Sequence, residues 1–238
     1  MTSLETPKTK AVVLLSGGLD STVLLASTLH AGRQVLPIAF DYGQRHRQEL
    51  FAAREIQRAF RYPKGDWDVH SLKIVDLDAL NTVAKGSSQL GDLPVPHGHY
   101  AEESMKATVV PNRNMTMLAL ATAYAISNGA AEVAYAAHAG DHTIYPDCRP
   151  AFAEVMRKAI SLCDYESRTP LLVTPFISIS KADIVIIGRD LSAPMHLTYS
   201  CYEGREHHCG LCGTCVERKE AFEVAGVKDP TQYYKEGV

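Results

Sequence analysis

Four cysteines lie within fifteen positions near the C-terminus, at Cys201, Cys209, Cys212 and Cys215. In a reducing compartment, cysteines with this spacing indicate a metal site before they indicate disulfides. Four thiolates around Zn²⁺ form a closed tetrahedral centre, which is typical of a structural zinc. An iron–sulfur cluster is the alternative, because Cys-x2-Cys-x2-Cys also occurs in ferredoxins. We favour zinc, since ferredoxin-like runs continue with a further Cys and Pro, whereas Val216 follows here.

The other thiols and the histidines near this cluster receive simpler interpretations. His207 and His208 lie inside the cysteine loop and could replace a thiolate as ligands, but we expect both to face solvent. Cys148 and Cys163 lie apart from the cluster, and we expect them to behave as small buried hydrophobic residues.

A second chemical motif is the run SGGLDST at residues 16–22, between a predicted strand and a predicted helix. Its two glycines let the backbone turn sharply and approach an anion closely. The helix N-terminus that follows offers unpaired N–H groups and the positive end of a dipole. A glycine-rich turn with an ordinary helix cap is the simpler alternative. The run matches neither the Walker loop nor the dinucleotide-binding glycine pattern.

Three further polar segments cover residues 41–46, 110–114 and 139–149. They fall where ligands bind in an open α/β sheet, beyond the carboxyl ends of the strands. Their planar donors, carboxylates and aromatic rings suit a flat heterocycle that carries a carboxylate. Ordinary turn and capping chemistry explains any one segment alone. Three of them together with a phosphate-binding loop favour a ligand site.

Alternating strand and helix patterns predict the scaffold that must position these motifs. Short buried apolar runs predict strands at 11–15, 35–40, 69–77, 132–137 and 171–174. Apolar stripes and capping residues predict helices at 20–31, 49–60, 115–128, 150–162 and 180–188. Residues 81–108, which contain several Pro and Gly, are expected to form an irregular excursion. The predicted fold is α/β: a parallel twisted sheet with helices on both faces, plus a small C-terminal zinc module.

The composition divides the chain in two and excludes several classes of protein. From residue 194 the sequence is rich in His, Cys and Gly, so we predict an α/β domain at 1–193 and a zinc module with its packed C-terminal helix at 194–238. The net charge of −3 argues against a general nucleic-acid coat or a polybasic membrane patch. The sequence also shows no apolar run long enough to span a membrane and no signal-peptide pattern at its start.

The loop at residues 16–22 resembles the S-G-G-x-D-S-T loop of the N-type ATP pyrophosphatases. Members of that superfamily cleave ATP between its α and β phosphates and adenylate an oxygen of their substrate. The resemblance implies an adenine nucleotide alpha hydrolase-like fold, with Asp20 helping to hold Mg²⁺ on the pyrophosphate. The residues that it implies for ATP binding are Leu15, Ser16, Gly17, Gly18, Leu19, Asp20, Ser21, Thr22, Val23, Leu24 and Leu25.

Within this superfamily the chain most resembles the 7-cyano-7-deazaguanine synthase family of queuosine biosynthesis. The matching stretches are residues 12–23, 40–46, 110–114, 145–149, 174–184 and 200–215. They follow one another in order along nearly the whole chain. The YPDCR segment at 145–149 and the cysteine module are much more specific than the phosphate loop, which identifies the superfamily alone.

This resemblance implies an ATP-dependent ligase that forms carbon–nitrogen bonds. It would convert 7-carboxy-7-deazaguanine and ammonia to 7-cyano-7-deazaguanine (preQ0) through an adenylated carboxylate and an amide intermediate. ATP, Mg²⁺ and Zn²⁺ are the implied cofactors, and Asp20 and Lys181 are the implied catalytic residues. Cationic groups such as Lys181 offset the charge on a departing pyrophosphate. A solvated lysine in the first turn of a helix is the simpler interpretation of Lys181.

The same resemblance implies a set of substrate-binding residues. Arg113 and Arg149 are expected to bind the carboxylate or the phosphates, and Asp141 and Asp147 the guanine-like edge. The full expected set is Tyr42, Gln44, Arg45, Arg113, Asp141, Tyr145, Asp147 and Arg149.

Three other functions compete with this hypothesis. A tRNA-thiolating ATP pyrophosphatase would need catalytic cysteines near the active loop and an RNA-binding appendage, and the chain shows no basic stripe. A non-catalytic zinc-bearing interaction protein would not need the intact phosphate loop with Asp20. A related deazaguanine-transferring enzyme stays open. We expect a cytoplasmic homodimer that takes small-molecule substrates and binds neither nucleic acid nor membrane.

Overall fold

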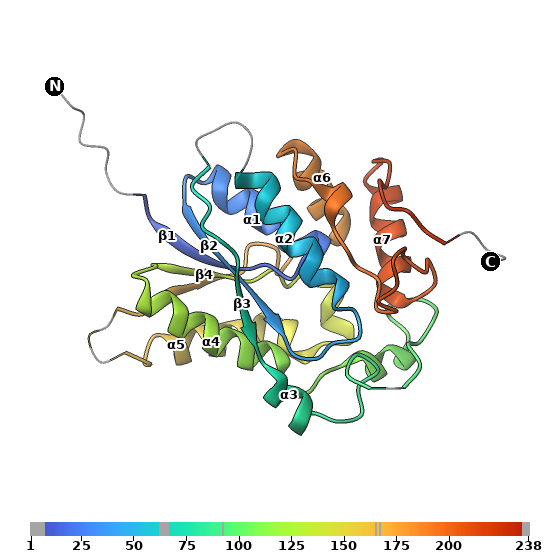
Figure 1. Cartoon of the computed structure of the whole chain (residues 1–238), viewed down its shortest axis with the longest axis horizontal. Helices are drawn as coiled ribbons and strands as arrows, with labels where there is room; N and C mark the ends of the chain where they lie inside the picture. Colours follow the sequence, from blue (N-terminus) through green and yellow to red (C-terminus); the bar gives the residue numbers. More distant parts are fainter. Residues whose placement is uncertain (1–7, 62–66, 92, 165, 167, 235–238) are drawn as a thin grey trace.

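The computed structural model describes residues 8–61, 67–91, 93–164, 166 and 168–234. Five parallel strands form one twisted sheet in the order β3-β2-β1-β4-β5, as Figure 1 shows. The chain runs outward from β1 to β3 on one side and then from β4 to β5 on the other, so the direction reverses between β1 and β4. The strands are β1 (Lys10–Leu14), β2 (Gln34–Asp41), β3 (Lys73–Asp76), β4 (Glu132–Ala134) and β5 (Leu171–Val173).

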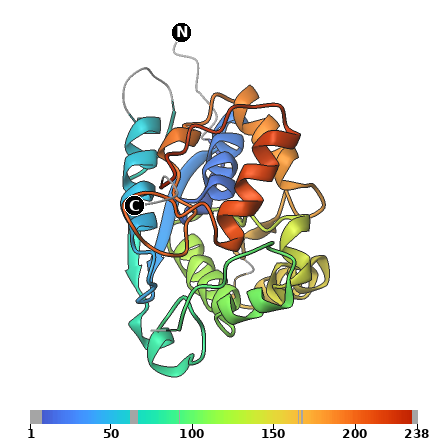
Figure 2. The same cartoon turned by 90° about the vertical axis from the view of Figure 1, so that its right-hand side faces the viewer.

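Helices cover both faces of this sheet, which confirms the predicted α/β fold. One layer holds α1 (Leu19–His30), α2 (Gln48–Arg61) and α6 (Lys181–Asp190), and α6 packs on α1. Helix α7 (Gly213–Val224) packs on α6 (Figures 1 and 2). The opposite layer holds α4 (Arg113–Ser127) and α5 (Pro150–Ile160). The short α3 (Asp78–Val83) follows β3. Short 3-10 helices cover Glu103–Thr108, Ala139–Thr143, Pro146–Cys148 and Met195–Leu197.

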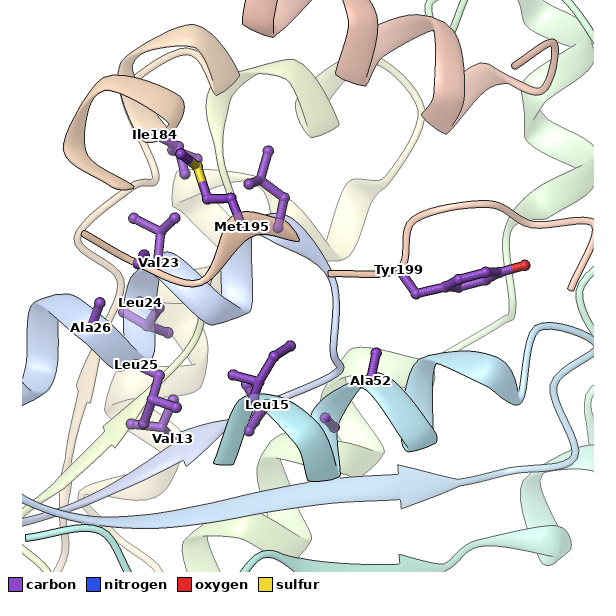
Figure 3. Close-up of a cluster of buried hydrophobic side chains, with 14 of the residues drawn as sticks. Val13, Leu15, Val23, Leu24, Leu25, Ala26, Ala52, Ile184, Met195 and Tyr199 are labelled. Atoms are coloured by element: carbon purple, nitrogen blue, oxygen red, sulfur yellow. The ribbon is translucent and has the colours of Figure 1, made fainter. Parts of the chain in front are cut away.

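Successive residues of β1 face opposite layers, so the central strand divides the interior into two hydrophobic clusters. Val13 packs in the cluster with α1, α2 and α6, whereas Val12 packs in the cluster with α4 and α5. Figure 3 shows part of the first cluster, where Ile184 and Met195 lie near Val23 of α1. Burial on both faces explains why the strands are continuous apolar runs rather than alternating ones.

The predicted element positions are right, but several boundaries are wrong. Strand β3 covers only Lys73–Asp76, and Val69 makes just an isolated bridge to Val35. Strand β4 ends at Ala134 instead of 137, because its neighbour β5 is only three residues long and the chain then turns away from the sheet. The expected irregular region 81–108 contains the end of α3 and a 3-10 helix.

Helices α1, α2 and α4 begin one or two residues earlier than the apolar pattern predicted. Helix α4 starts at Arg113 rather than 115, after Asn112 has adopted a left-handed conformation with φ of 60°. Helix α7 starts at Gly213 and therefore contains Cys215. Its Phe222 is buried, whereas Val224 is exposed.

The C-terminal segment packs directly on the α/β domain. One hydrophobic cluster joins Leu25 and Ile184 of the domain with Cys201, Cys215 and Phe222 of the segment. The boundary between residues 193 and 194 stays a prediction. Within the described ranges, no helix combines the length and the apolar character that crossing a membrane requires.

Arg218 of α7 anchors this packing from a fully buried position. Its guanidinium donates from Nη1 to Thr198 Oγ1 at 2.8 Å, from Nη2 to the Met195 carbonyl at 3.3 Å, and from Nε to Asp229 Oδ1 at 3.1 Å. The Phe222 ring lies 4.9 Å from the guanidinium carbon. One side chain thus ties α7, the preceding segment and the C-terminal tail together.

Replacing Arg218 by Met should lower the free energy of unfolding by about 3–5 kcal/mol, because Asp229 and the buried acceptors lose their partner. Denaturant unfolding measures the change. Arg58→Met is the matched control, since Arg58 is exposed and pairs with Glu55 across one helix turn. Equal stability of the two variants would contradict the anchoring role.

Candidate active site

A cavity of about 250 Å³ opens at the carboxyl ends of β1, β2 and β4. Leu15, Phe40 and Ala137, which follow or end these strands, form its floor. Tyr100 of the excursion and Glu217 of α7 contribute to its walls. Ligands of open α/β folds bind where the strand order reverses, and the cavity lies at this point of the sheet.

The phosphate loop occupies the turn between β1 and α1, on the wall of this cavity. Gly17 has φ of +95°, and a Cβ atom placed there would lie only 2.1 Å from the Glu49 carbonyl oxygen of α2. Only glycine fits this position, because L side chains rarely adopt such a conformation and the space is filled. Gly18 caps α1 without a side-chain hydrogen bond to the helix, so backbone N–H groups at this end of α1 are free to bind an anion.

The structure separates the eleven proposed ATP-binding residues into three groups. Gly17 and Thr22 lie behind the loop and hold its shape, the latter by donating from Oγ1 to the Gly18 carbonyl at 2.7 Å. Val23, Leu24 and Leu25 are buried in the hydrophobic cluster around α1. The residues that line the cavity are Leu15, Ser16, Gly18, Leu19, Asp20 and Ser21.

Lys181 and Asp20, the two proposed catalytic residues, form an ion pair at one end of the cavity. The Lys181 ammonium lies 3.3 Å from Asp20 Oδ2 and 2.7 Å from Glu217 Oε2. Burial disfavours the charged lysine, but the carboxylates of Asp20, Glu217 and Asp141 outweigh it and raise the pKa of Lys181. Burial likewise opposes ionisation of Asp20, and the nearby Lys181 and His138 nevertheless lower its pKa. The pair is therefore ionised at neutral pH.

His138 completes this charged cluster from the turn after β4. Its Nε2 lies 3.8 Å from Asp20, 3.6 Å from Asp141 and 3.9 Å from Glu217, measured to the nearest carboxylate oxygens. Its Nδ1 accepts a hydrogen bond from the Gly140 N–H, so the N–H of the ring that faces the carboxylates is the one on Nε2. Burial raises the pKa of Asp141, and Glu217 and Asp20 raise it further against the opposing effect of His138 and Lys181.

Aromatic and planar polar groups line the other part of the cavity. Arg113 donates from Nη1 to the Tyr42 hydroxyl at 3.1 Å and to Gln89 Oε1 at 2.8 Å. The hydroxyls of Tyr145 and Tyr202 lie 3.3 Å apart. Stacking on these rings, with a guanidinium at their edge, suits a flat and charged heterocycle. Three of the proposed substrate residues thus come together here, namely Tyr42, Arg113 and Tyr145, and Asp141 lines the charged end.

The other four proposed substrate residues support the walls and do not line the cavity. Gln44 is buried and donates to the Phe40 carbonyl and to Glu49, at 3.1 and 2.9 Å. Arg45 binds the carbonyls of Gly91 and Leu93 at 2.6 and 2.9 Å, which fixes the excursion.

Asp147 and Arg149 stabilise the turn after β4 by hydrogen bonds. The Asp147 carboxylate accepts from the Asn114 N–H at 3.3 Å and so caps α4. Arg149 donates to the His142 carbonyl at 2.8 Å. These two residues therefore order the loop that carries Asp141.

Sequence reasoning missed several residues that the fold brings to the cavity. Glu217 and Glu49 lie on predicted helices among other charged residues, so nothing in the sequence distinguished them as residues of the cavity. His138 and Tyr202 flank motifs that the sequence did single out, and their positions beside Asp141 and Cys201 were the available signal.

The four clustered cysteines come together as predicted. Their Sγ atoms all lie within 4.8 Å of one another, and those of Cys209 and Cys215 are 3.9 Å apart. Tetrahedral Zn–S bonds of ~2.3 Å would separate the sulfur atoms by about 3.8 Å, so the donor set fits zinc. The backbone N–H groups of Cys209 and Cys212 point at cluster sulfur atoms, at 3.3 and 3.2 Å, as suits thiolate ligands.

Two expectations around the cluster were wrong. His208 does not face solvent: it is buried between Tyr199 and Tyr233, and its Nε2 accepts from the Ser200 N–H at 2.9 Å. Burial lowers the pKa of His208 to about 4, with a further contribution from Arg218. Cys163 is exposed rather than buried, because it lies beyond the end of α5, whereas Cys148 is buried as expected.

A comparison with known protein families identifies the family of this chain. The family model described as queuosine biosynthesis protein QueC matches residues 10–226. The chain belongs to this family. A 7-cyano-7-deazaguanine synthase of Methanoregula boonei is 49% identical over 94% of this chain and 99% of its own length. Synthases of the same name from Caldicellulosiruptor saccharolyticus and Pseudoalteromonas translucida are 47% and 44% identical over 94% of this chain, and 95% and 98% of their own lengths.

Solved structures resemble this QueC-family chain more distantly. A 4-thiouridine synthetase in complex with RNA and ATP is 20% identical with a TM-score of 0.43, over 78% of this chain and 41% of that chain. The NMN synthetase of Francisella tularensis is 12% identical with a TM-score of 0.46, over 93% of this chain and 78% of that chain. The family assignment therefore comes from the sequence relatives.

Gly17→Ala should destabilise the protein more than Gly32→Ala does. Both glycines have positive φ, at +95° and +76°, but only Gly17 lies against backbone atoms, whereas nothing surrounds a Cβ at Gly32 within 4 Å. The difference between the two free energies of unfolding isolates the contact with Glu49 from the conformational strain. Indistinguishable values would mean that the loop moves away from α2 without cost.

Proposed function

We propose that this enzyme is an ATP-dependent ligase that converts 7-carboxy-7-deazaguanine and ammonia to 7-cyano-7-deazaguanine in queuosine biosynthesis. The observation that carries the proposal is a single cavity that joins a phosphate-binding helix end to an aromatic, arginine-bearing wall. The names of its relatives, which match over nearly their whole length, support the same reaction.

The proposed reaction activates the same carbon twice. A carboxylate oxygen of the substrate attacks the α-phosphorus of ATP, and the bond to pyrophosphate breaks. Ammonia then forms the C–N bond while the C–O bond to AMP breaks, and one proton leaves the nitrogen. The amide oxygen attacks a second ATP. Loss of the second AMP and of the two remaining nitrogen protons leaves the nitrile.

The residues at the charged end suit the departure of pyrophosphate. The free N–H groups at the start of α1 and the ammonium of Lys181 face the position where negative charge develops. Asp20 Oδ1 is buried and has no hydrogen-bond partner, so it fits an oxygen ligand of Mg²⁺, which would neutralise phosphate charge when bound. Glu217 holds Lys181 in place from α7.

The aromatic part of the cavity suits the substrate. Both hydrogen bonds that the described contacts give Arg113 come from Nη1, so its other N–H groups remain available for a carboxylate or a phosphate. The cavity volume of about 250 Å³ and the net charge of −3 support a small molecule rather than a nucleic acid as substrate. The homodimer and the cytoplasmic location stay predictions.

Chromatography of the spent nucleotide, with mass analysis of the product, tests the reaction. The purified protein with ATP, Mg²⁺, ammonium and 7-carboxy-7-deazaguanine should yield AMP, pyrophosphate and the nitrile. Asp20→Ala should fold normally and lose turnover by at least about a hundredfold, because an electrostatic contact to the reacting phosphates disappears. Asp190→Ala, which changes an exposed carboxylate on α6, should retain full activity. ADP as the main product would overturn the assignment, and near-wild-type turnover by Asp20→Ala would contradict the role of Asp20.

We further propose that the four cysteines hold a structural Zn²⁺, since four thiolates leave the metal no open position. Cys212→Ala should lose zinc and lower the melting temperature, because the start of α7 loses its anchor. Cys163→Ala, at an exposed thiol outside the cluster, should change neither property. Metal analysis beside melting curves decides: zinc retained by Cys212→Ala, or iron with visible absorbance in the wild type, would contradict the proposal.

A further inference from the structure

Glu49 is the carboxylate of the cavity that the proposed chemistry leaves without a role. The cavity has four acidic residues among those described, and three of them, Asp20, Asp141 and Glu217, surround Lys181 and His138. Glu49 takes no part in that cluster. Its electrostatic neighbours are Arg113 and Asp41, which lie at the aromatic part of the cavity and at the end of β2. It therefore belongs to the substrate half of the site.

The carboxylate of Glu49 is held in place but can accept further hydrogen bonds. Its Oε1 accepts from Gln44 Nε2 at 2.9 Å, and its Oε2 lies 3.5 Å from Nε2 of the buried His46. A carboxylate can accept about four hydrogen bonds, so acceptor positions remain on both oxygens. The side chain is 14% exposed and lines the cavity. No Lys or Arg nitrogen among the described residues lies within 4 Å of it to neutralise its charge.

A 2-amino-6-oxo ring presents two parallel donors, the ring N1–H and the exocyclic amino group. Two parallel acceptors of a carboxylate match them in a bidentate pair, which is both strong and specific. Asp147, one of the two carboxylates expected to bind this edge, caps α4 instead, and Asp141 faces His138. Glu49 has the required chemistry and lies among Tyr42, His46 and Arg113 in the cavity wall.

We propose that Glu49 recognises the 2-amino-6-oxo edge of the substrate by accepting hydrogen bonds from N1–H and the 2-amino group. The inference rests on the proposed function, because it names the residue that selects a deazaguanine in that reaction. Gln44 and His46 act as positioning residues: they fix the carboxylate plane without occupying all of its acceptor sites.

Burial also makes this recognition depend on pH. It raises the pKa of Glu49 to about 7, against the opposing effects of Gln44 and Arg113 and with a further increase from Asp41. The other nearby group, His46, stays neutral in this range, because burial with Arg113 and Arg45 lowers its pKa to about 3. Donors on the bound ring favour ionised Glu49, so substrate affinity should rise as the pH increases through 7.

The experiment compares the full-length wild type with Glu49→Gln, and uses Glu55→Gln, at a half-exposed carboxylate of α2 outside the cavity, as the control. Glu49→Gln should raise the KM for 7-carboxy-7-deazaguanine about tenfold to a hundredfold, the range expected for a charge-assisted hydrogen bond, with kcat changed little. The KM for ATP should not change. Glu55→Gln should match the wild type.

A 2-desamino analogue of the substrate, used as a competitive inhibitor, isolates the contact. The wild type should bind it at least about tenfold more weakly than the substrate. Glu49→Gln should weaken the binding of this analogue less than it weakens the binding of the substrate, because only the N1–H contact remains to be lost. The ratio of wild-type to variant kcat/KM should fall as the pH is lowered from 8 to 6, since protonated Glu49 resembles glutamine. The pH-dependent concentration of free ammonia affects both proteins equally, so it cancels in this ratio.

Each alternative outcome has a separate meaning. A fall in kcat at constant KM would assign Glu49 to proton transfer and overturn the proposal. Equal weakening of substrate and analogue, or a ratio that does not change with pH, would indicate a merely structural side chain and would also overturn it. If the wild type forms no nitrile at all, the proposed function itself fails, whatever the variant does.

Discussion

The buried ammonium group of Lys181 connects three separate parts of this molecule. It lies on α6, its partner Asp20 belongs to the phosphate loop, and Glu217 reaches it from α7. A buried charge without any partner costs several kcal/mol, so these contacts favour the packing of the three helices against one another. This contact also links the cysteine cluster to the charged end of the cavity, because Glu217 lies on the helix that begins within the cluster.

The parts of the fold that depend on local sequence could be predicted. Apolar runs such as 11–15 indicated buried strands because both faces of the sheet are covered. The phosphate loop and the four cysteines are contiguous in sequence, so their spacing alone carries the geometry. Strand lengths were predicted less well, since β4 ends where its partner β5 ends, and pairing partners are not visible in a single strand.

The candidate site was predictable only where a motif lies in one segment. Tyr42, Arg113 and Tyr145 lie in polar loops after or before apolar elements, and all three line the cavity. Asp147 belongs to such a loop as well, yet it caps a helix that begins 34 residues earlier in the sequence, because tertiary packing brings Asn114 to it. Glu217 shows the converse: a charged residue on an amphipathic helix is usually solvated, and only the packing of α7 on α6 places it at Lys181.

The close contact between Gly17 and the Glu49 carbonyl has a consequence for how the two substrates bind. The loop proposed to receive the phosphates and the first turn of α2 touch without space for a methyl group, so neither can move toward the other alone. A movement of the loop toward α2 on nucleotide binding would therefore displace the backbone that carries the Glu49 side chain. Such a contact couples the two binding equilibria, and thermodynamic reciprocity requires that each substrate changes the affinity of the other by the same factor.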